Sequence, residues 1–76
     1  MIENIAHPTP RVIARIQAKA TASNGWLVIE DTARRIFLLT DNTIRCYDDG
    51  VEFTDDDGEH VTLGYDQIAL IENGNN

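Results

Sequence analysis

The chain has 76 residues, a net charge of −7 and an apolar content of 42%. A chain of this length buries only roughly 60% of its unfolded surface, which excludes a second hydrophobic core. The apolar content favours a folded domain over an acidic disordered tail, the charge disfavours nucleic-acid binding, and no apolar run reaches the ~18 residues of a membrane span.

The charge is divided along the chain. All six basic residues lie at or before Arg45, together with four acidic ones, and no lysine or arginine follows. The remaining carboxylates all belong to the second part: Asp48, Asp49, Glu52, Asp55, Asp56, Asp57, Glu59, Asp66 and Glu72. Such a segment attracts cationic partners and repels phosphate. The single cysteine and the lack of a secretory signal favour a cytoplasmic location.

We expect a single domain over residues 1–76, with residues 1–9 as a flexible arm and residues 73–76 as a flexible tail. Residues 10–22 fit two patterns. Thr9 before Pro10 resembles a helix N-terminus, and Asn24-Gly25 would end that helix. Apolar residues also alternate in this segment as in a strand. Helix is the first choice and strand the alternative.

A spacing of four residues keeps side chains on one side of a strand and nearly so on a helix. Arg11, Arg15 and Lys19 therefore form a basic strip in either case. By the same spacing we expect Val12, Ile16 and Ala20 on the buried face. The strip is either a solvated surface or a docking site for an acidic one.

The rest of the chain is predicted to form short antiparallel strands separated by turns. Residues that face each other across a hairpin lie on one side of a sheet, so loop lengths can be chosen that pair apolar with apolar. A four-residue loop at 31–34 pairs Val28 with Phe37. A two-residue loop at 41–42 then pairs Leu39 with Ile44.

A four-residue loop at 47–50 and a three-residue loop at 56–58 continue the pattern. They pair Ile44 with Phe53 and Phe53 with Val61, and Gly58 takes the left-handed position of the second turn. The predicted core face consists of Trp26, Val28, Phe37, Leu39, Ile44, Cys46, Val51, Phe53, Val61 and Leu63.

Four apolar residues remain on the opposite face: Leu27, Ile29, Ile36 and Leu38. Leaving them in water would forgo roughly 1.5–3 kcal/mol each, so we expect residues 11–22, the last strand or a second subunit to cover them.

Residues 64–67 are predicted to form a one-turn break before a final strand at 68–72. The fold class is mainly β: a small antiparallel curled sheet or barrel of five to six strands with the element at 10–22. The outline of a first helix, a meander and a turn before the last strand resembles SH3-like and Sm-like barrels. That resemblance carries no diagnostic motif.

The acidic turns do not fit an EF-hand, because Phe53 and Gly64 stand where calcium ligands are needed. His7, Cys46 and His60 are too scattered for zinc. The sequence therefore indicates no metal, no cofactor and no catalytic residue.

We expect a non-enzymatic module that binds a basic protein. One form of this expectation is a nucleic-acid-mimicking inhibitor of phage or mobile-element type, whose acidic turns imitate a row of phosphates and occupy a site normally used by nucleic acid. The acidic partner-binding residues are Asp48, Asp49, Asp55, Asp56, Asp57 and Glu59. The alternative is a homo-oligomer joined by the apolar face, with the basic strip of one copy meeting the acidic turns of the next. A third is an Sm-like RNA-binding barrel, which the net charge opposes.

Overall fold

The computed structural model describes residues 2–41 and 43–74 and contains seven strands, one α-helix and one short 3₁₀ helix. The elements are β1 (Ile2–Ala6), α1 (Pro10–Ala22), β2 (Trp26–Asp31), β3 (Ile36–Leu39), β4 (Ile44–Cys46), β5 (Gly50–Thr54), β6 (His60–Gly64), η1 (Tyr65–Gln67) and β7 (Ile68–Gly74). Two antiparallel sheets result. Sheet A has the strand order β1-β7-β2-β3, and sheet B has the order β4-β5-β6.

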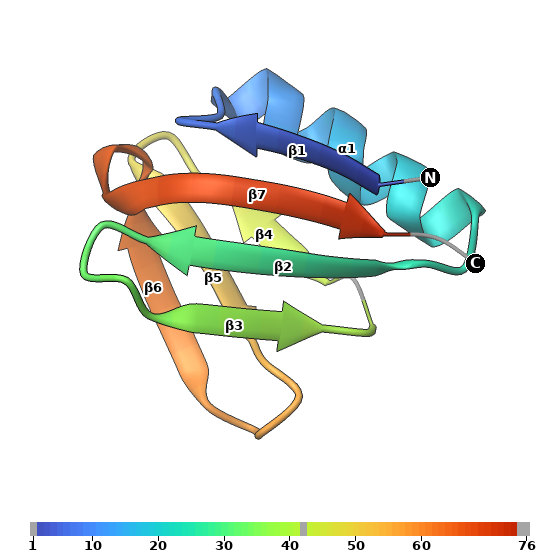
Figure 1. Ribbon diagram of the computed structural model, residues 1–76. Coiled ribbons are helices and arrows are strands. Elements are labelled where there is room, and N and C mark those ends of the chain that lie inside the picture. Colours follow the sequence, from blue (N-terminus) through green and yellow to red (C-terminus); the bar gives the residue numbers. More distant parts are fainter. Residues whose placement is uncertain (1, 42, 75–76) are drawn as a thin grey trace.

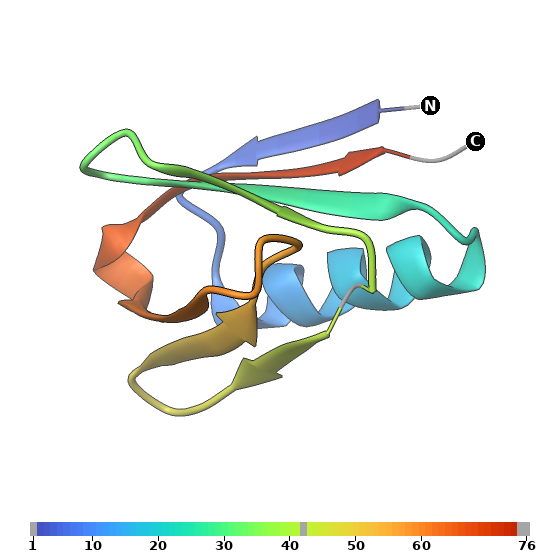
Figure 2. The ribbon, with the colours of Figure 1, turned by 90° about the horizontal axis from the view of Figure 1, so that it is seen from below.

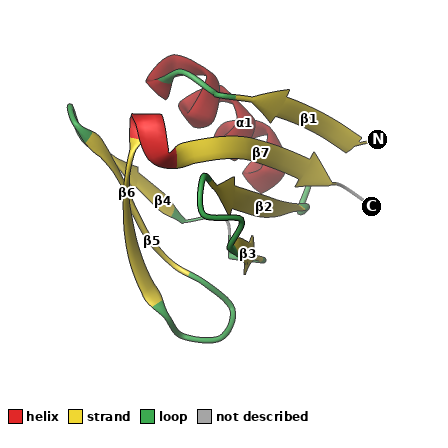
Figure 3. Ribbon diagram, turned by 60° about the vertical axis from the view of Figure 1, so that its left-hand side comes forward, coloured by secondary structure: helices red, strands yellow, loops and turns green. Residues whose placement is uncertain are grey.

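Sheet A forms one layer of the molecule, and both α1 and sheet B lie on the same side of it (Figures 1 and 2). The helix packs against β7 and β2, and it also contacts β4 of sheet B (Figure 3). The inner face of sheet A is therefore covered. Its other face, which is turned toward the viewer in Figure 1, has no element of the described chain over it.

The helix is confirmed over residues 10–22. Thr9 Oγ1 accepts the N–H of Val12 at 3.3 Å, and Pro10 stands at the first helical position, where no N–H is needed. The chain leaves the helix through Asn24, at φ 56°, and Gly25 donates its N–H to the carbonyl of Ala20. The buried residues of α1 are Ile13, Ile16 and Ala20. Ile16 and Ala20 are buried as expected, but Ile13 is buried in place of Val12, which is only half-buried.

The predicted meander of sheet B is confirmed residue by residue. Ile44 pairs with Phe53, and Phe53 pairs with Val61, as the loop lengths require. Gly58 has φ 84° in the turn between β5 and β6, the conformation that glycine adopts without steric cost. The break at 64–67 is also confirmed, as η1.

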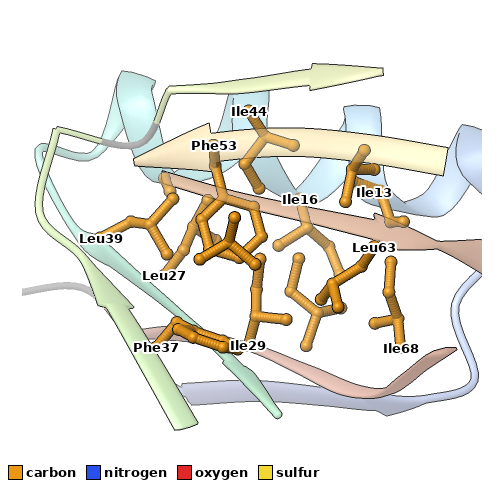
Figure 4. Packing of buried hydrophobic residues seen from close by; sticks show 14 residues of the cluster. Ile13, Ile16, Leu27, Ile29, Phe37, Leu39, Ile44, Phe53, Leu63 and Ile68 are labelled. Carbon is orange, nitrogen blue, oxygen red and sulfur yellow. The ribbon is translucent and has the colours of Figure 1, made fainter. Parts of the chain in front are cut away.

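The predicted register of β2 against β3 is wrong by one residue. Val28 pairs with Leu38 rather than Phe37, and Ile29 pairs with Phe37. Because successive side chains of a strand point to opposite faces, this shift exchanges the two faces of β2, whereas Phe37 and Leu39 of β3 face the core as predicted. Leu27 and Ile29 lie in the core (Figure 4), whereas Trp26 and Val28 lie on the opposite side.

The predicted hairpin between β3 and β4 does not exist, because the two strands belong to different sheets. Among the described strands no ladder joins sheet A to sheet B, so the sheets do not close into a barrel and the SH3-like or Sm-like outline is not confirmed. Asn42, in the predicted loop, lies outside the described residues. Cys46, predicted to face the core, is exposed.

Both ends of the chain contribute to sheet A. Residues 2–6, expected as part of an arm, form β1 and pair with β7, for example Ile5 with Ile71. Asn73 and Gly74, expected in the tail, belong to β7, and residues 75–76 lie outside the described part. The last strand therefore lies between β1 and β2 and is an inner strand of the sheet.

We expect Leu27→Ala and Ile36→Ala to differ sharply, since Leu27 is 0% exposed and Ile36 is 67% exposed. Loss of Leu27 leaves a core cavity and should cost roughly 2–5 kcal/mol, whereas Ile36→Ala should stay within about 0.5 kcal/mol of the wild type. Urea unfolding followed by circular dichroism measures both. Equal destabilisation would contradict the observed register.

Candidate functional site

Asp31 organises the turn between β2 and β3. Its carboxylate Oδ1 accepts the N–H of Ala33 at 3.0 Å and that of Arg35 at 2.8 Å, while Oδ2 accepts Nε of Arg35 at 2.7 Å. The side chain of Asp31 is 4% exposed. Burial raises the pKa of Asp31, but the hydrogen bonds and charge of Arg35 and the N–H of Ala33 outweigh it, so the pKa is lowered.

The turn between β5 and β6 has the same construction. Asp55 Oδ1 accepts the N–H groups of Asp57 at 3.0 Å and Glu59 at 2.9 Å, and Gly58 takes the left-handed position. In the turn after Asp31 the left-handed position belongs to Arg34, at φ 68°. Sequence reasoning placed a loop at both turns, but only the loop marked by glycine gave the correct pairing. The loop predicted at 31–34 gave the wrong register, because arginine does not mark a left-handed position. The common signal is the aspartate that opens each turn.

The turn after Asp31 joins β2 to β3, so its length sets which side chains of β2 point outward from sheet A. We call the uncovered side its outer face. By register and burial, the outer face carries Asn4, Ala6, Leu70, Glu72, Gly74, Trp26, Val28, Glu30, Ile36 and Leu38. Most of these residues are apolar. The two carboxylates stand on the central strands β2 and β7. Along these strands Glu72 lies between Leu70 and Gly74, and Glu30 follows Val28 near the end of β2.

The outer face of sheet A exposes several large apolar side chains. Ile36 is 67% exposed and Leu38 is 43% exposed, and Trp26, Val28 and Leu70 are half-buried. Isolated exposed apolar residues are normal on a protein surface, but five on adjoining strands form a continuous patch. Such patches are typical of binding surfaces.

Among the described residues, the two carboxylates of the outer face have no cationic partner. Glu30 faces Ile36 and Leu70 across the ladders, and Glu72 faces Val28. Both glutamates are half-buried, and within residues 2–41 and 43–74 neither forms an ion pair. They are diagonal neighbours on adjacent strands, a position in which Cα atoms lie ~7–8 Å apart, close enough for like charges to repel.

Trp26 lies across β7 at the end of the patch. An added Cβ at Gly74 would stand 2.1 Å from Cζ2 of the indole and 2.7 Å from Nε1, so the ring occupies the space above that glycine. Gly74 is the cross-strand partner of Trp26. The absence of a side chain there lets the indole lie against the backbone of β7 and extends the patch as a flat aromatic surface.

Of the four residues predicted to form an apolar interface, two are exposed and two are not. Ile36 and Leu38 are exposed as expected, but Leu27 and Ile29 are core residues at 0% and 1% exposure. The residues that sequence reasoning missed are Trp26, Val28, Leu70 and the two glutamates. The one-residue register error placed the first two on the wrong face, and Leu70 joins the patch through strand pairing distant in sequence.

The acidic residues are placed at two ends of sheet B. Asp48 and Asp49 lie in the turn before β5, while residues 55–59 form the turn after it, so the predicted acidic set does not converge. Two of its members have structural roles. Asp55 holds its own turn, and Asp56 accepts the N–H and the hydroxyl of Thr40 at 2.9 and 3.1 Å.

Asp56 also binds to the edge strand β3 of sheet A. Its N–H donates to the carbonyl of Leu38 at 2.9 Å, on the side of β3 away from β2. An edge strand with free backbone groups invites a further strand, and this contact occupies one of those groups. The β3 edge is therefore partly blocked, whereas the outer face beside it is open.

At the other end of sheet B, Tyr65 links η1 to the turn before β5. Its hydroxyl donates to the carbonyl of Tyr47 at 2.5 Å. Burial, followed by electrostatic interactions with Cys46 and with the carboxylates of Asp48 and Asp49, raises the pKa of Tyr65. The phenol stays protonated at neutral pH and keeps its donor role.

The basic strip lies on the exposed side of α1: Arg11, Arg15 and Lys19 are all exposed. The helix covers the inner face of sheet A, so the strip and the outer face lie on opposite sides of the molecule (Figure 2). The two predicted surfaces cannot contact one partner element together.

A shallow hollow of about 240 Å³ lies on the solvent side of sheet B. Its polar lining includes Glu52 and His60, whose Oε2 and Nε2 are 3.4 Å apart, and the ring of His60 also meets the hydroxyl of Thr54 at 3.4 Å. In the described residues no three His, Cys, Asp or Glu side chains are grouped to hold a metal ion.

No protein-family model, curated protein or solved structure matches this chain. Among the helices described, none has the length and apolar character needed to cross a membrane.

We expect Asp31→Asn to lower the melting temperature at pH 7 by several degrees, because the amide loses the charge that faces Arg35. The folded-state pKa of Asp31 lies below its usual 3.8, so its stabilising effect is present above that value and is lost as pH falls through the folded pKa. The difference between the variant and the wild type should therefore shrink below about pH 4. Thermal melts across pH measure this, with Asp57→Asn as the exposed control. Equal melting at pH 7 would refute the role of Asp31.

Gly74→Ala should displace the indole of Trp26 without unfolding the sheet, since the methyl group takes the space of the ring. As Trp26 is the single tryptophan, its fluorescence reports the change directly. A red-shifted emission maximum with unchanged far-ultraviolet circular dichroism is the expected result. An unshifted maximum would show that the ring does not lie over Gly74.

Proposed function

We propose that this chain is a small non-enzymatic binding module that docks a basic protein partner on the outer face of sheet A. One observation carries the proposal: Ile36 and Leu38 remain 67% and 43% exposed on an ordered strand, next to the half-buried Trp26, Val28 and Leu70. A layer of secondary structure covers the inner face, and a partner would supply the second cover.

The apolar side chains of this face supply part of the free energy that a specific contact needs. Covering the exposed parts of Ile36 and Leu38 contributes roughly 2–3 kcal/mol, since a fully buried aliphatic side chain contributes about 1.5–3 kcal/mol. Trp26 adds an aromatic surface of the kind enriched at the centres of protein interfaces. Affinity then depends on how well the two glutamates are matched.

The charge of the face favours a basic partner over a second copy. Two copies packed face to face would bring two pairs of Glu30 and Glu72 into one interface, with no cation from this face to compensate. RNA is disfavoured for the same reason, and the net charge of −7 repels phosphate over longer distances. Proteins that bind nucleic acid carry the required cations, so they are among the partners that this module suits.

The acidic turns have a secondary part in this proposal. Asp48, Asp49, Asp57 and Glu59 raise the negative field around the molecule and would speed encounter with a cationic protein. Asp55 and Asp56 are held by local hydrogen bonds, which weakens the idea that all six turn carboxylates imitate a row of phosphates.

A random peptide library selected on the immobilised protein tests the proposal. We expect selected peptides to combine aliphatic residues with lysine or arginine, and to lose at least tenfold in affinity for an Ile36→Ser, Leu38→Ser double variant. Tyr47→Ser is the matched control, because Tyr47 is also exposed, at 50%, but lies on the turn before β5.

Two outcomes would overturn the proposal. Selected peptides that bind the Ile36→Ser, Leu38→Ser variant as well as the wild type would place recognition elsewhere on the molecule. A light-scattering mass of two or more chains that falls to one chain in that variant would show that the face is occupied by another copy.

A further inference from the structure

We propose that Glu30 and Glu72 form a two-carboxylate seat for one lysine or arginine, presented by an amphipathic helix of the partner. This inference rests on the proposed function and specifies the partner's chemistry. It depends on where the two glutamates stand within the apolar patch and on the blocked edge of β3.

The seat lies among the apolar side chains of the outer face. Glu30 stands between Leu70 and Ile36 across the sheet, and Glu72 stands between Val28 and Asn4. Their diagonal relation leaves them on adjacent strands with both side chains on the same face. A cationic group placed between them donates hydrogen bonds to both carboxylates, while the flanking carbons of the partner contact Leu70 and Val28.

The charges of the unbound face are unbalanced. Both glutamates are half-buried and lack ion pairs in the described chain, so each carboxylate repels the other in partly desolvated surroundings. A cation at this position removes the repulsion and adds two charge-assisted hydrogen bonds. An apolar partner without the cation would instead bury both carboxylates unpaired, which is strongly unfavourable. The pair therefore selects for the cation.

The partly blocked edge of β3, which is the edge of sheet A beside Ile36 and Leu38, favours a helix as the docking element. Asp56 occupies the carbonyl of Leu38, so an added strand along β3 would first have to displace the turn between β5 and β6. Packing on the face requires no such change. A helix with aliphatic residues at i, i+3, i+4 and i+7 and one cation within that stripe would match apolar surroundings and a central acidic pair.

Two synthetic peptides test the inference. Both are leucine-rich amphipathic helices of about 18 residues, and they differ only at the centre of the apolar stripe, where one carries lysine and the other glutamine. Their affinities are measured by titration against the wild type, Glu30→Gln/Glu72→Gln and the charge-matched control Asp57→Asn/Glu59→Gln, whose two residues are exposed.

We expect the lysine peptide to bind the wild type about tenfold more tightly than the glutamine peptide. That preference should fall below about twofold in Glu30→Gln/Glu72→Gln and persist in the control, since only the first variant removes the seat. Glu30→Gln/Glu72→Gln should also melt no lower than the wild type, because it removes a repulsion.

The outcomes separate the inference from the proposed function. A lysine preference that survives Glu30→Gln/Glu72→Gln, or no binding of the lysine peptide at millimolar concentration, overturns the seat. If the peptides bind but Ile36→Ser/Leu38→Ser weakens neither, the outer face is not the docking surface and the proposed function itself fails.

Discussion

The hydrogen bonds of the Asp31 carboxylate are the constraint on which the outer face depends. They fold residues 31–35 into a turn that pairs Ile29 with Phe37, and this register sends Leu27 and Ile29 into the core. A shift of one residue would bury Trp26 and Val28 instead and expose two core side chains. The surface through which the protein is proposed to bind is thus set by one buried carboxylate and the main chain around it.

The two-layer arrangement explains why so small a chain can have an open apolar face. Helix α1 and sheet B together cover the inner face of sheet A, and fourteen apolar residues of the described chain are buried there. No described element covers the other side. The exposure of Ile36 and Leu38 therefore follows from the fold and does not reflect poor packing of the core. Their exposure is the basis of the functional proposal.

Charge gives the open face its selectivity. Hydrophobic contact alone would accept any apolar surface, including a second copy of this chain. Glu30 and Glu72 make such contacts unfavourable unless a cation is supplied, and the acidic second part of the chain extends the same preference over longer distances. Apolar area provides the attraction, and the carboxylates restrict which partners can use it.

Local patterns in the sequence determined the helix at 10–22 and the meander from β4 to β6, because caps, turn glycines and cross-strand pairs act between residues close in the chain. Gly58 marked the left-handed position of its turn, whereas no glycine marked that of Arg34, so the loop predicted at 31–34 set the register of β2 and β3 wrong by one residue. Only the tertiary structure decided that β7 lies between β1 and β2, that β3 and β4 part into two sheets, and that Leu70 and Glu72 join Trp26, Glu30 and Ile36 on one surface. Those contacts join segments far apart in the chain, and their free energy depends on the burial that the whole fold creates.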